Sequence, residues 1–181
     1  MENLRNPTIP HNFQEMTFRE LKSPFIHRLH PSARVLLSGL PGSRNDLGAD
    51  LRDIRAAGIV LILCLARDGE LGAYGKTMSS SSDGTLRWLH CPTNPSCGAE
   101  AGHELKLALD EVIQTLIQGS TVLIHCQAGQ IRTGCAAASL LVLLGSSLEQ
   151  ASVAVEEAGS FPFDDGPLPL LEVIVSSIRS R

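Results

Sequence analysis

Aromatic residues are scarce in this chain: they make up 4% of its 181 residues, with one tryptophan and one tyrosine. Charged residues are also few, at 19%, and acidic side chains outnumber basic ones, which gives a formal net charge of −4. Proteins that bind nucleic acids or anionic membrane surfaces normally carry a basic patch, so we predict neither as a partner. No apolar run has the length of a transmembrane helix.

The five cysteines follow no regular framework. An odd number of cysteines without disulfide-type spacing is typical of a reducing compartment. No CxxC pair or Cys/His cluster indicates a structural metal, and the first residues lack the apolar core of a secretory signal. We therefore predict a cytoplasmic or nuclear protein that needs no metal and no other cofactor.

Apolar runs alternate with helical patterns along the chain, which is the order typical of an α/β fold. We predict a single domain over residues 31–181, with a central, mostly parallel sheet of four to five strands and helices on both faces. Residues 1–30 are predicted to form an arm with a short helix at 17–22. The predicted strands are 34–38, 59–65, 86–91 and 122–124, and the predicted helices are 45–57, 100–118, 135–144, 147–159 and 168–179.

Residues 66–83 have the least regular pattern and end near four consecutive serines. We predict a flexible surface loop for the serines. The stretch Arg67-Asp68-Gly69-Glu70-Leu71 within this segment is compatible with the same loop or with the rim of an active site.

The chain is organised around the segment Thr121–Gly134, TVLIHCQAGQIRTG, which joins an apolar strand to an apolar helix. Backbone N–H groups and the helix dipole make such a turn an anion site. A cysteine at its floor, Cys126, should be held largely as the thiolate. Arg132 supplies a planar fork for two phosphate oxygens. Gly129 permits a close backbone approach, and the hydroxyl of Thr133 can hydrogen-bond the sulfur.

These residues match the pattern HCxxGxxR followed by Ser or Thr, so the segment resembles the cysteine-dependent protein phosphatases. The resemblance implies that Cys126 attacks phosphorus, that Arg132 holds the phosphoryl oxygens, and that water hydrolyses a phosphocysteine intermediate. Thr133 would assist the departure of the sulfur. The remaining loop residues are then expected to contact the substrate or to order the loop: His125, Gln127, Ala128, Gly129, Gln130 and Ile131.

Further short motifs are similar to those of the cyclin-dependent-kinase-associated phosphatases in the dual-specificity group. They are Leu40-Pro41-Gly42, Gly58-Ile59, Gly69-Glu70-Leu71 with Tyr74, and Cys91-Pro92. This resemblance extends from about residue 25 to the C-terminus and implies a phosphorylated protein, such as a kinase, as substrate and partner. The helix that follows the Gly-Glu-Leu stretch in that family is predicted to be replaced here by residues 75–82.

The general acid of these phosphatases is an Asp on the loop after the third strand, and this chain has no Asp at that position. The equivalent residue is Pro95 or Asn94, and neither can donate a proton near neutral pH. We therefore predict that the usual acid is missing and that Asn94 contacts the substrate instead. Glu100, Asp68 and Asp83 are the nearby carboxylates that could replace it.

Three other functions stay open. A pseudophosphatase that binds phosphate without turnover would explain the missing acid. A phosphoinositide phosphatase would share the Ala-Gly and Arg-Thr pairs of the loop, but such enzymes typically add loop lysines, where this chain has Gln127 and Gln130. An arsenate reductase could use the same thiolate and oxyanion cradle, but it would need a second redox cysteine nearby.

Cys64 lies near the end of a strand that is predicted to neighbour the Cys126 strand. Related phosphatases imply a role for such a cysteine: it captures the oxidised nucleophile as a reversible disulfide. An inert buried cysteine is the alternative.

Overall fold

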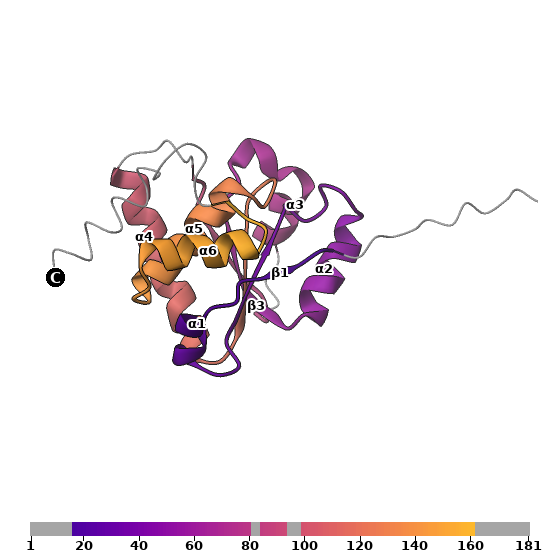
Figure 1. The fold of residues 1–181 in the computed structure, drawn as a ribbon. Coiled ribbons are helices and arrows are strands. Elements are labelled where there is room, and N and C mark those ends of the chain that lie inside the picture. The colour runs from indigo at the N-terminus through magenta and orange to yellow at the C-terminus, as the bar shows by residue number, and fades with distance from the viewer. Residues whose placement is uncertain (1–15, 81–83, 94–98, 162–181) are drawn as a thin grey trace, which may run out of the picture.

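The computed structural model describes residues 16–80, 84–93 and 99–161. Their strands form one five-stranded sheet in the order β1-β2-β5-β3-β4 (Figure 1). All neighbouring strands are parallel except β1, which pairs antiparallel with β2. The strands are β1 (Arg19–Glu20), β2 (Arg34–Ser38), β3 (Ile59–Cys64), β4 (Arg87–His90) and β5 (Thr121–His125).

Six helices of the described residues cover both faces of the sheet (Figure 1). One core cluster lies between the sheet and α1, α4, α5 and α6, and the other lies between the sheet and α2 and α3. The predicted α/β fold with a mostly parallel sheet and helices on both faces is therefore confirmed. The helices are α1 (Pro24–Leu29), α2 (Leu47–Ala56), α3 (Asp68–Ser80), α4 (Ala99–Ile117), α5 (Ile131–Leu143) and α6 (Leu148–Glu157).

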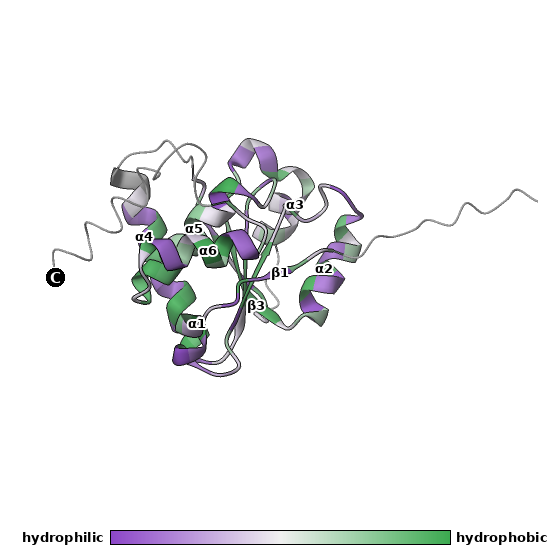
Figure 2. Ribbon diagram, viewed as in Figure 1, coloured by the Kyte–Doolittle hydropathy of each residue, from purple (hydrophilic) through white to green (hydrophobic). Residues whose placement is uncertain are grey.

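The central position of β5 explains why its sequence is continuously apolar. It lies between β2 and β3, and each of its five residues is buried, as expected for a parallel strand covered on both faces. Figure 2 shows green, hydrophobic strands inside the molecule and purple, hydrophilic residues on the outer faces of the helices. The HCxxGxxR segment, residues 125–132, thus begins at the carboxyl end of a buried strand, and we call it the phosphate loop.

The surface loop predicted for the serines is wrong at Ser79 and Ser80, because both belong to α3, which spans Asp68–Ser80. The serine hydroxyls are satisfied within the helix: Ser79 donates to the carbonyl of Gly75 at 2.7 Å and Ser80 donates to that of Lys76 at 2.9 Å. The helix is kinked at Gly72, whose φ is 51°. The chain therefore keeps a helix after its Gly-Glu-Leu stretch, and residues 81–83 lie outside the described part.

The helix predicted at residues 17–22 is also wrong. Arg19 and Glu20 form β1 and pair with Leu37 and Leu36 of β2. The next residues form α1, which begins at a serine cap and buries Ile26 against the core. Residues 1–15 and the predicted helix at 168–179 lie outside the described part.

The remaining predicted elements agree with the structure to within a few residues at each end. The helix predicted from Ser147 begins with the expected capping box, in which Ser147 and Gln150 exchange side-chain-to-backbone hydrogen bonds. Among the described helices, none has both the length and the hydropathy required to cross a membrane.

Candidate active site

The phosphate loop follows β5 at the carboxyl edge of the sheet, where ligand sites of parallel sheets gather. Its turn is fixed by Gly129, which has a φ of 72°. A Cβ atom added there would lie 2.3 Å from the carbonyl oxygen of Ser38, so a side chain is excluded by contact as well as by conformation. The end of β2 also holds the loop, since the Leu40 N–H donates to the Gln127 carbonyl at 3.0 Å.

Cys126 lies at the floor of this loop and is buried, with 2% of its surface exposed. Its sulfur accepts a hydrogen bond from the Gly129 N–H at 3.2 Å. Helix α5 begins immediately after the loop, and no side chain caps its first turn at Gln130. The loop thus brings this sulfur together with a backbone N–H donor and with an uncapped helix N-terminus, and both of these groups bind anions.

Thr133 is fully buried, and its hydroxyl has no hydrogen-bond partner among the described residues. The hydrogen bond that the sequence suggested between this hydroxyl and the sulfur of Cys126 is therefore not formed in this structure. A buried hydroxyl without a partner beside an anion site is able to donate to a bound oxyanion or to the sulfur after a rotation about its own Cα–Cβ bond.

Two residues far away in sequence hold the carbonyl of Gly129. Ser160 donates to it through its hydroxyl at 2.9 Å, and the guanidinium of Arg19 donates both to it and to the carbonyl of Gly159. The N–H of Gly129 thereby donates to the sulfur of Cys126, while the C=O of the same residue is held by Arg19 and Ser160. Sequence reasoning missed Arg19 and Ser160, because no local pattern links them to the loop.

Arg132 is oriented by a bidentate ion pair with Glu70. Its Nη1 lies 2.6 Å from one carboxylate oxygen and its Nη2 lies 3.0 Å from the other, and Nη1 also donates to the carbonyl of Leu65 at 3.2 Å. These three bonds use three of the five N–H donors of a guanidinium. The Nε–H and the second Nη2 N–H remain, and they form the adjacent edge that can bind two oxygens of one phosphoryl group.

Glu70 is the functional residue that the sequence left undecided. The hydrogen bonds from Arg132 hold the pKa of its carboxyl at about 2. Glu70 also accepts from the backbone N–H of Arg67 at 2.8 Å, which places it at the start of α3 and fixes that helix against the phosphate loop. Arg67, just before the helix, is not the Ser or Thr of a capping box, so the Gly69-Glu70-Leu71 motif was the available signal in the sequence.

Replacing Glu70 with glutamine should lower kcat/KM for an aryl phosphate by about 10²-fold, because the neutral amide releases the Arg132 fork from its fixed orientation. The ion pair of Glu70 with Arg132 also stabilises the folded protein. Its contribution to the free energy of unfolding should be fully present above about pH 4.5 and be lost as the pH falls to about 2. Steady-state kinetics of Glu70→Gln beside Glu149→Gln, an exposed carboxylate on α6, measure the effect. Equal activity of the two variants would contradict this role.

His125 orders the loop as a neutral side chain. It is completely buried, which lowers its pKa to about 4. Its Nδ1 lies 3.3 Å from the carbonyl oxygen of Cys126, and its Nε2 lies 2.9 Å from the hydroxyl of Tyr74. Since a carbonyl can only accept, Nδ1 carries the proton and the Tyr74 hydroxyl donates to Nε2.

The stability of the protein should therefore depend on pH through His125. The folded pKa is about 4 and the unfolded value is about 6.5, so the unfolded chain takes up this proton first as the pH falls. The contribution of His125 to the free energy of unfolding should be fully present above about pH 6.5. It should fall by roughly 3 kcal/mol as the pH reaches about 4. Urea unfolding across this range measures the fall. The same fall in His125→Asn would assign it to other groups.

Cys64 is the last residue of β3 and pairs with His125 across the sheet, one residue before Cys126. Burial raises the pKa of the Cys64 thiol to about 11, so it is a poor nucleophile in the resting protein. The predicted disulfide with Cys126 stays a prediction.

Mild peroxide should convert Cys126 to the sulfenic acid. The Cys64 sulfur would then attack the Cys126 sulfur, which forms the disulfide and releases water. The expected result is inactivation that dithiothreitol reverses in the native protein but much less in Cys64→Ser, with Cys91→Ser as control. Equal recovery of all three proteins would rule the disulfide out as the protective species.

The predicted substrate contact Asn94 lies outside the described residues, as do Pro95, Asp83 and the side chain of Glu100. The loop that carries Asn94 starts beside the site, since Thr93 N–H donates to the Leu65 carbonyl at 3.3 Å. Asp68, the other candidate acid, is described. Its side chain is 90% exposed and lies 3.8 Å from Nδ1 of His90.

The described residues contain no group of three or more His, Cys, Asp or Glu side chains that could hold a metal ion. The groups gathered at this site are a sulfur, a guanidinium edge, a buried hydroxyl and loop N–H groups, which together suit an oxyanion.

The tyrosine phosphatase family model matches residues 90–152, which include the whole phosphate loop. None of the curated proteins matches the sequence.

Solved structures with a similar fold include kinase-associated phosphatase with serine in place of its catalytic cysteine. Its TM-score is 0.72 at 20% identity, and the match covers 92% of this chain and 96% of that chain. The human tyrosine phosphatase-like serine/threonine/tyrosine-interacting protein has a TM-score of 0.62 at 16% identity, with coverages of 90% and 96%. PTPMT1 in complex with PI(5)P has a TM-score of 0.62 at 18% identity, with coverages of 81% and 94%.

Identities this low show a shared fold, and the family match adds the residues of the phosphate loop. The match of the tyrosine phosphatase family model over residues 90–152 and the shared phosphatase fold confirm the resemblance to the cysteine-dependent phosphatases that the loop sequence predicted.

Proposed function

We propose that this protein is a phosphoprotein phosphatase that removes phosphate from phosphotyrosine, phosphothreonine or phosphoserine through a phosphocysteine intermediate on Cys126. The observation that carries the proposal is the way in which hydrogen bonds orient the guanidinium of Arg132. Glu70 fixes one edge of its guanidinium, and the adjacent edge, with Nε–H and the second Nη2 N–H, keeps two donors for the oxygens of a phosphoryl group.

In the first half-reaction, the sulfur of Cys126 attacks phosphorus and the ester oxygen leaves. The negative charge of the transferring group is stabilised by the free edge of Arg132 and by N–H groups at the start of α5. In the second half-reaction, water attacks the phosphocysteine and the thiolate leaves. After rotation about its Cα–Cβ bond, the Thr133 hydroxyl would donate to that leaving sulfur. We further propose that Gln127, Ala128, Gln130 and Ile131 surround the phosphoryl group, since they belong to the same loop.

The leaving ester oxygen needs a proton, and the loop that usually supplies it reads Pro92-Thr93-Asn94-Pro95-Ser96. We propose that this protein works without the usual aspartic acid and that Asn94 contacts the substrate. The same loop is the reason to keep a phosphate-binding pseudophosphatase as the second candidate, because a site with an intact cradle and no acid can bind without turnover.

Phosphoinositides are a weaker candidate substrate, although PTPMT1 was crystallised in complex with PI(5)P. The exposed loop positions of this chain carry Gln127 and Gln130, which are neutral and offer no charge to additional ring phosphates. We propose phosphorylated proteins, kinases among them, as the partners, and the cytoplasm or nucleus as the compartment.

The proposal is tested by turnover of nitrophenyl phosphate and of a phosphotyrosine peptide by the full chain, with Cys126→Ser as control. Hydrolysis of both that disappears in the variant supports a phosphatase. Binding of the peptide by both proteins without any turnover would favour the pseudophosphatase instead.

A further inference from the structure

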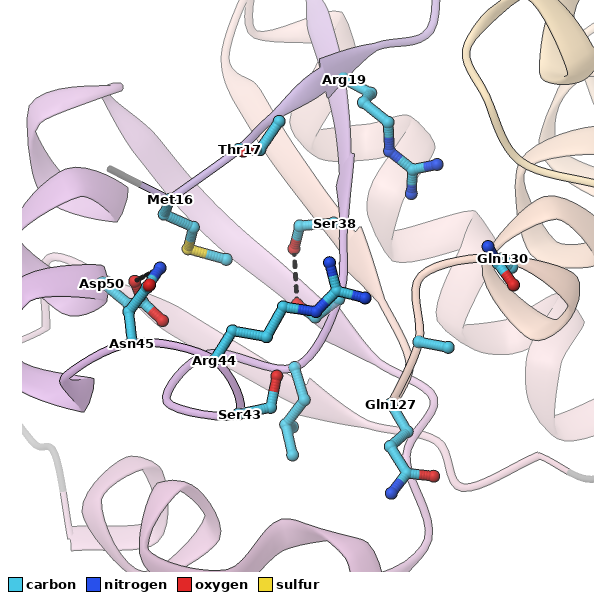
Figure 3. Close-up of a pocket in the computed structure, with 13 residues that line it drawn as sticks. Met16, Thr17, Arg19, Ser38, Ser43, Arg44, Asn45, Asp50, Gln127 and Gln130 are labelled. Atoms are coloured by element: carbon cyan, nitrogen blue, oxygen red, sulfur yellow. Dashed lines mark hydrogen bonds between the residues drawn. The ribbon is translucent and has the colours of Figure 1, made fainter. Parts of the chain in front are cut away.

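A cavity of about 310 Å³ lies directly beside the phosphate loop. One wall is the segment that leads into β1, the second is the turn between β2 and α2, and the third is the loop itself (Figure 3). The side chains that matter for its chemistry are polar or charged: Arg19, Ser43, Arg44, Asn45, Asp50, Gln127 and Gln130.

Two guanidinium groups and one carboxylate line the cavity, so positive charge exceeds negative charge there. Asp50 is buried, with 3% of its surface exposed. It accepts hydrogen bonds from the Gly42 N–H at 2.7 Å and from the Asn45 side-chain amide at 3.2 Å. These bonds hold the turn that carries Arg44, so Asp50 supports the wall of the cavity from within.

The guanidinium groups of Arg19 and Arg44 differ in what they contact. Arg19 enters from the β1 side (Figure 3) and donates to the carbonyls of Gly129 and Gly159. Arg44 extends from the opposite wall with its guanidinium over the cavity (Figure 3). It is exposed and forms no ion pair or hydrogen bond with any described residue. Arg44 therefore has its charge and five donors available to a ligand.

We propose that this cavity binds a second anionic group of the phosphoprotein substrate, either a phosphoryl or a carboxylate group, with Arg44 as the residue that determines this specificity. The inference rests on the proposed phosphatase function. Gln127 and Gln130 belong to the phosphate loop and also line the cavity. An anion bound in the cavity would therefore lie close to the scissile phosphate. A residue next to the phosphorylated one, or one position further, satisfies this.

A peptide fits the cavity better than a lipid headgroup does. Docking on an anionic bilayer relies on clusters of several Lys or Arg side chains. This chain has a net charge of −4, and the cavity offers two arginines on opposite walls with neutral glutamines at its loop side. That arrangement matches one additional anionic side chain.

The test measures binding to full-length Cys126→Ser, so it does not depend on turnover. Three phosphotyrosine peptides differ only in the flanking residues, which are alanine, glutamate or phosphothreonine. We expect the phosphothreonine peptide to bind about tenfold more tightly than the alanine peptide and the glutamate peptide to lie between them, as charge-assisted hydrogen bonds predict. Adding Arg44→Gln should bring the ratio close to one. Adding Arg52→Gln, which removes the same charge from an exposed position on α2, should preserve it.

Equal affinity for the three peptides, or an anion preference that survives Arg44→Gln, would overturn the inference. Stronger binding to phosphoinositide vesicles than to every peptide would overturn the choice of a peptide ligand. Failure of the phosphatase proposal has a different signature, which is the absence of nitrophenyl phosphate turnover by the native chain. The peptide affinities do not depend on turnover, so they test the cavity in either case.

Discussion

Replacing Cys126 with serine should lower turnover of nitrophenyl phosphate by roughly 10⁴–10⁶-fold, the loss seen when a covalent enzyme loses its nucleophile. No other described cysteine can substitute for it. Burial raises the pKa of Cys64 and Cys91 to about 11 and that of Cys135 to about 12, so these thiols are protonated at neutral pH.

The partner variant in this prediction is Arg132→Lys. Lysine keeps the charge but has neither the bidentate pair with Glu70 nor the free edge that faces the phosphoryl group. Loss of oxyanion donors typically costs about 10²–10³-fold in kcat, so we expect a loss in that range. Vanadate should also protect Cys126 of the native protein from alkylation and fail to protect it in Arg132→Lys.

Circular dichroism should show that both variants keep the native fold, since the loop is held by Gly129 and its contacts with Ser38, Arg19 and Ser160. Retention of more than a few per cent of activity by Cys126→Ser would contradict the covalent mechanism. Full activity of Arg132→Lys would contradict the role of the fork.

The second large effect should be a steep dependence of rate on the leaving group. A positioned general acid contributes about 10²–10⁴-fold, and the need for it grows with the basicity of the departing oxygen. Without an acid on the loop that carries Asn94, we expect modest turnover of nitrophenyl phosphate, weak turnover of phosphotyrosine peptides, and little turnover of phosphothreonine peptides.

Asn94→Asp should then raise the rate on phosphopeptides by about tenfold or more while changing the rate on nitrophenyl phosphate little, because nitrophenolate leaves without protonation. Pro95→Asp tests the other possibility, in which residue 95 and not residue 94 is equivalent to the usual aspartic acid. Similar efficiency of the native protein on all three substrates, together with a selective loss of peptide turnover in Asp68→Asn, would show that Asp68 supplies the proton.

The parts of the site that lie on one continuous segment could be predicted from the sequence. Cys126 and Arg132 are placed by a strand, a turn and a helix that follow one another, so their spacing already encodes their geometry. The glycine at 129 was likewise predictable, since the sharp turn and the close contact with Ser38 leave no room for a side chain.

The residues that support the loop come from distant segments, and sequence patterns do not encode such contacts. Arg19 was expected within a helix, but it lies in a two-residue edge strand and reaches Gly129. Glu70 was seen in a motif, but its pairing with Arg132 depends on β3 and β5 being neighbours in the sheet. Local patterns therefore predicted the reacting groups, whereas the residues that orient them required the fold.

Helix α3 shows why composition misled at one point. Serine and glycine are poorer helix formers than alanine, and residues 75–82 contain four serines and one glycine. Tertiary contacts decided the outcome: Leu71, Tyr74 and Met78 occupy one face of α3 and pack into the core. Tyr74 adds its hydrogen bond to His125, so burial of this face outweighs the weak propensity of the segment.

The central claim is that phosphate is transferred to Cys126, and rapid acid quenching during turnover tests it most directly. The native protein is mixed with nitrophenyl phosphate, quenched within milliseconds to seconds, digested and analysed by mass spectrometry. We predict a transient phosphate adduct on the peptide that carries Cys126, absent from Cys126→Ser and from Arg132→Ala. Active turnover with no adduct on that peptide at any time point would contradict the account.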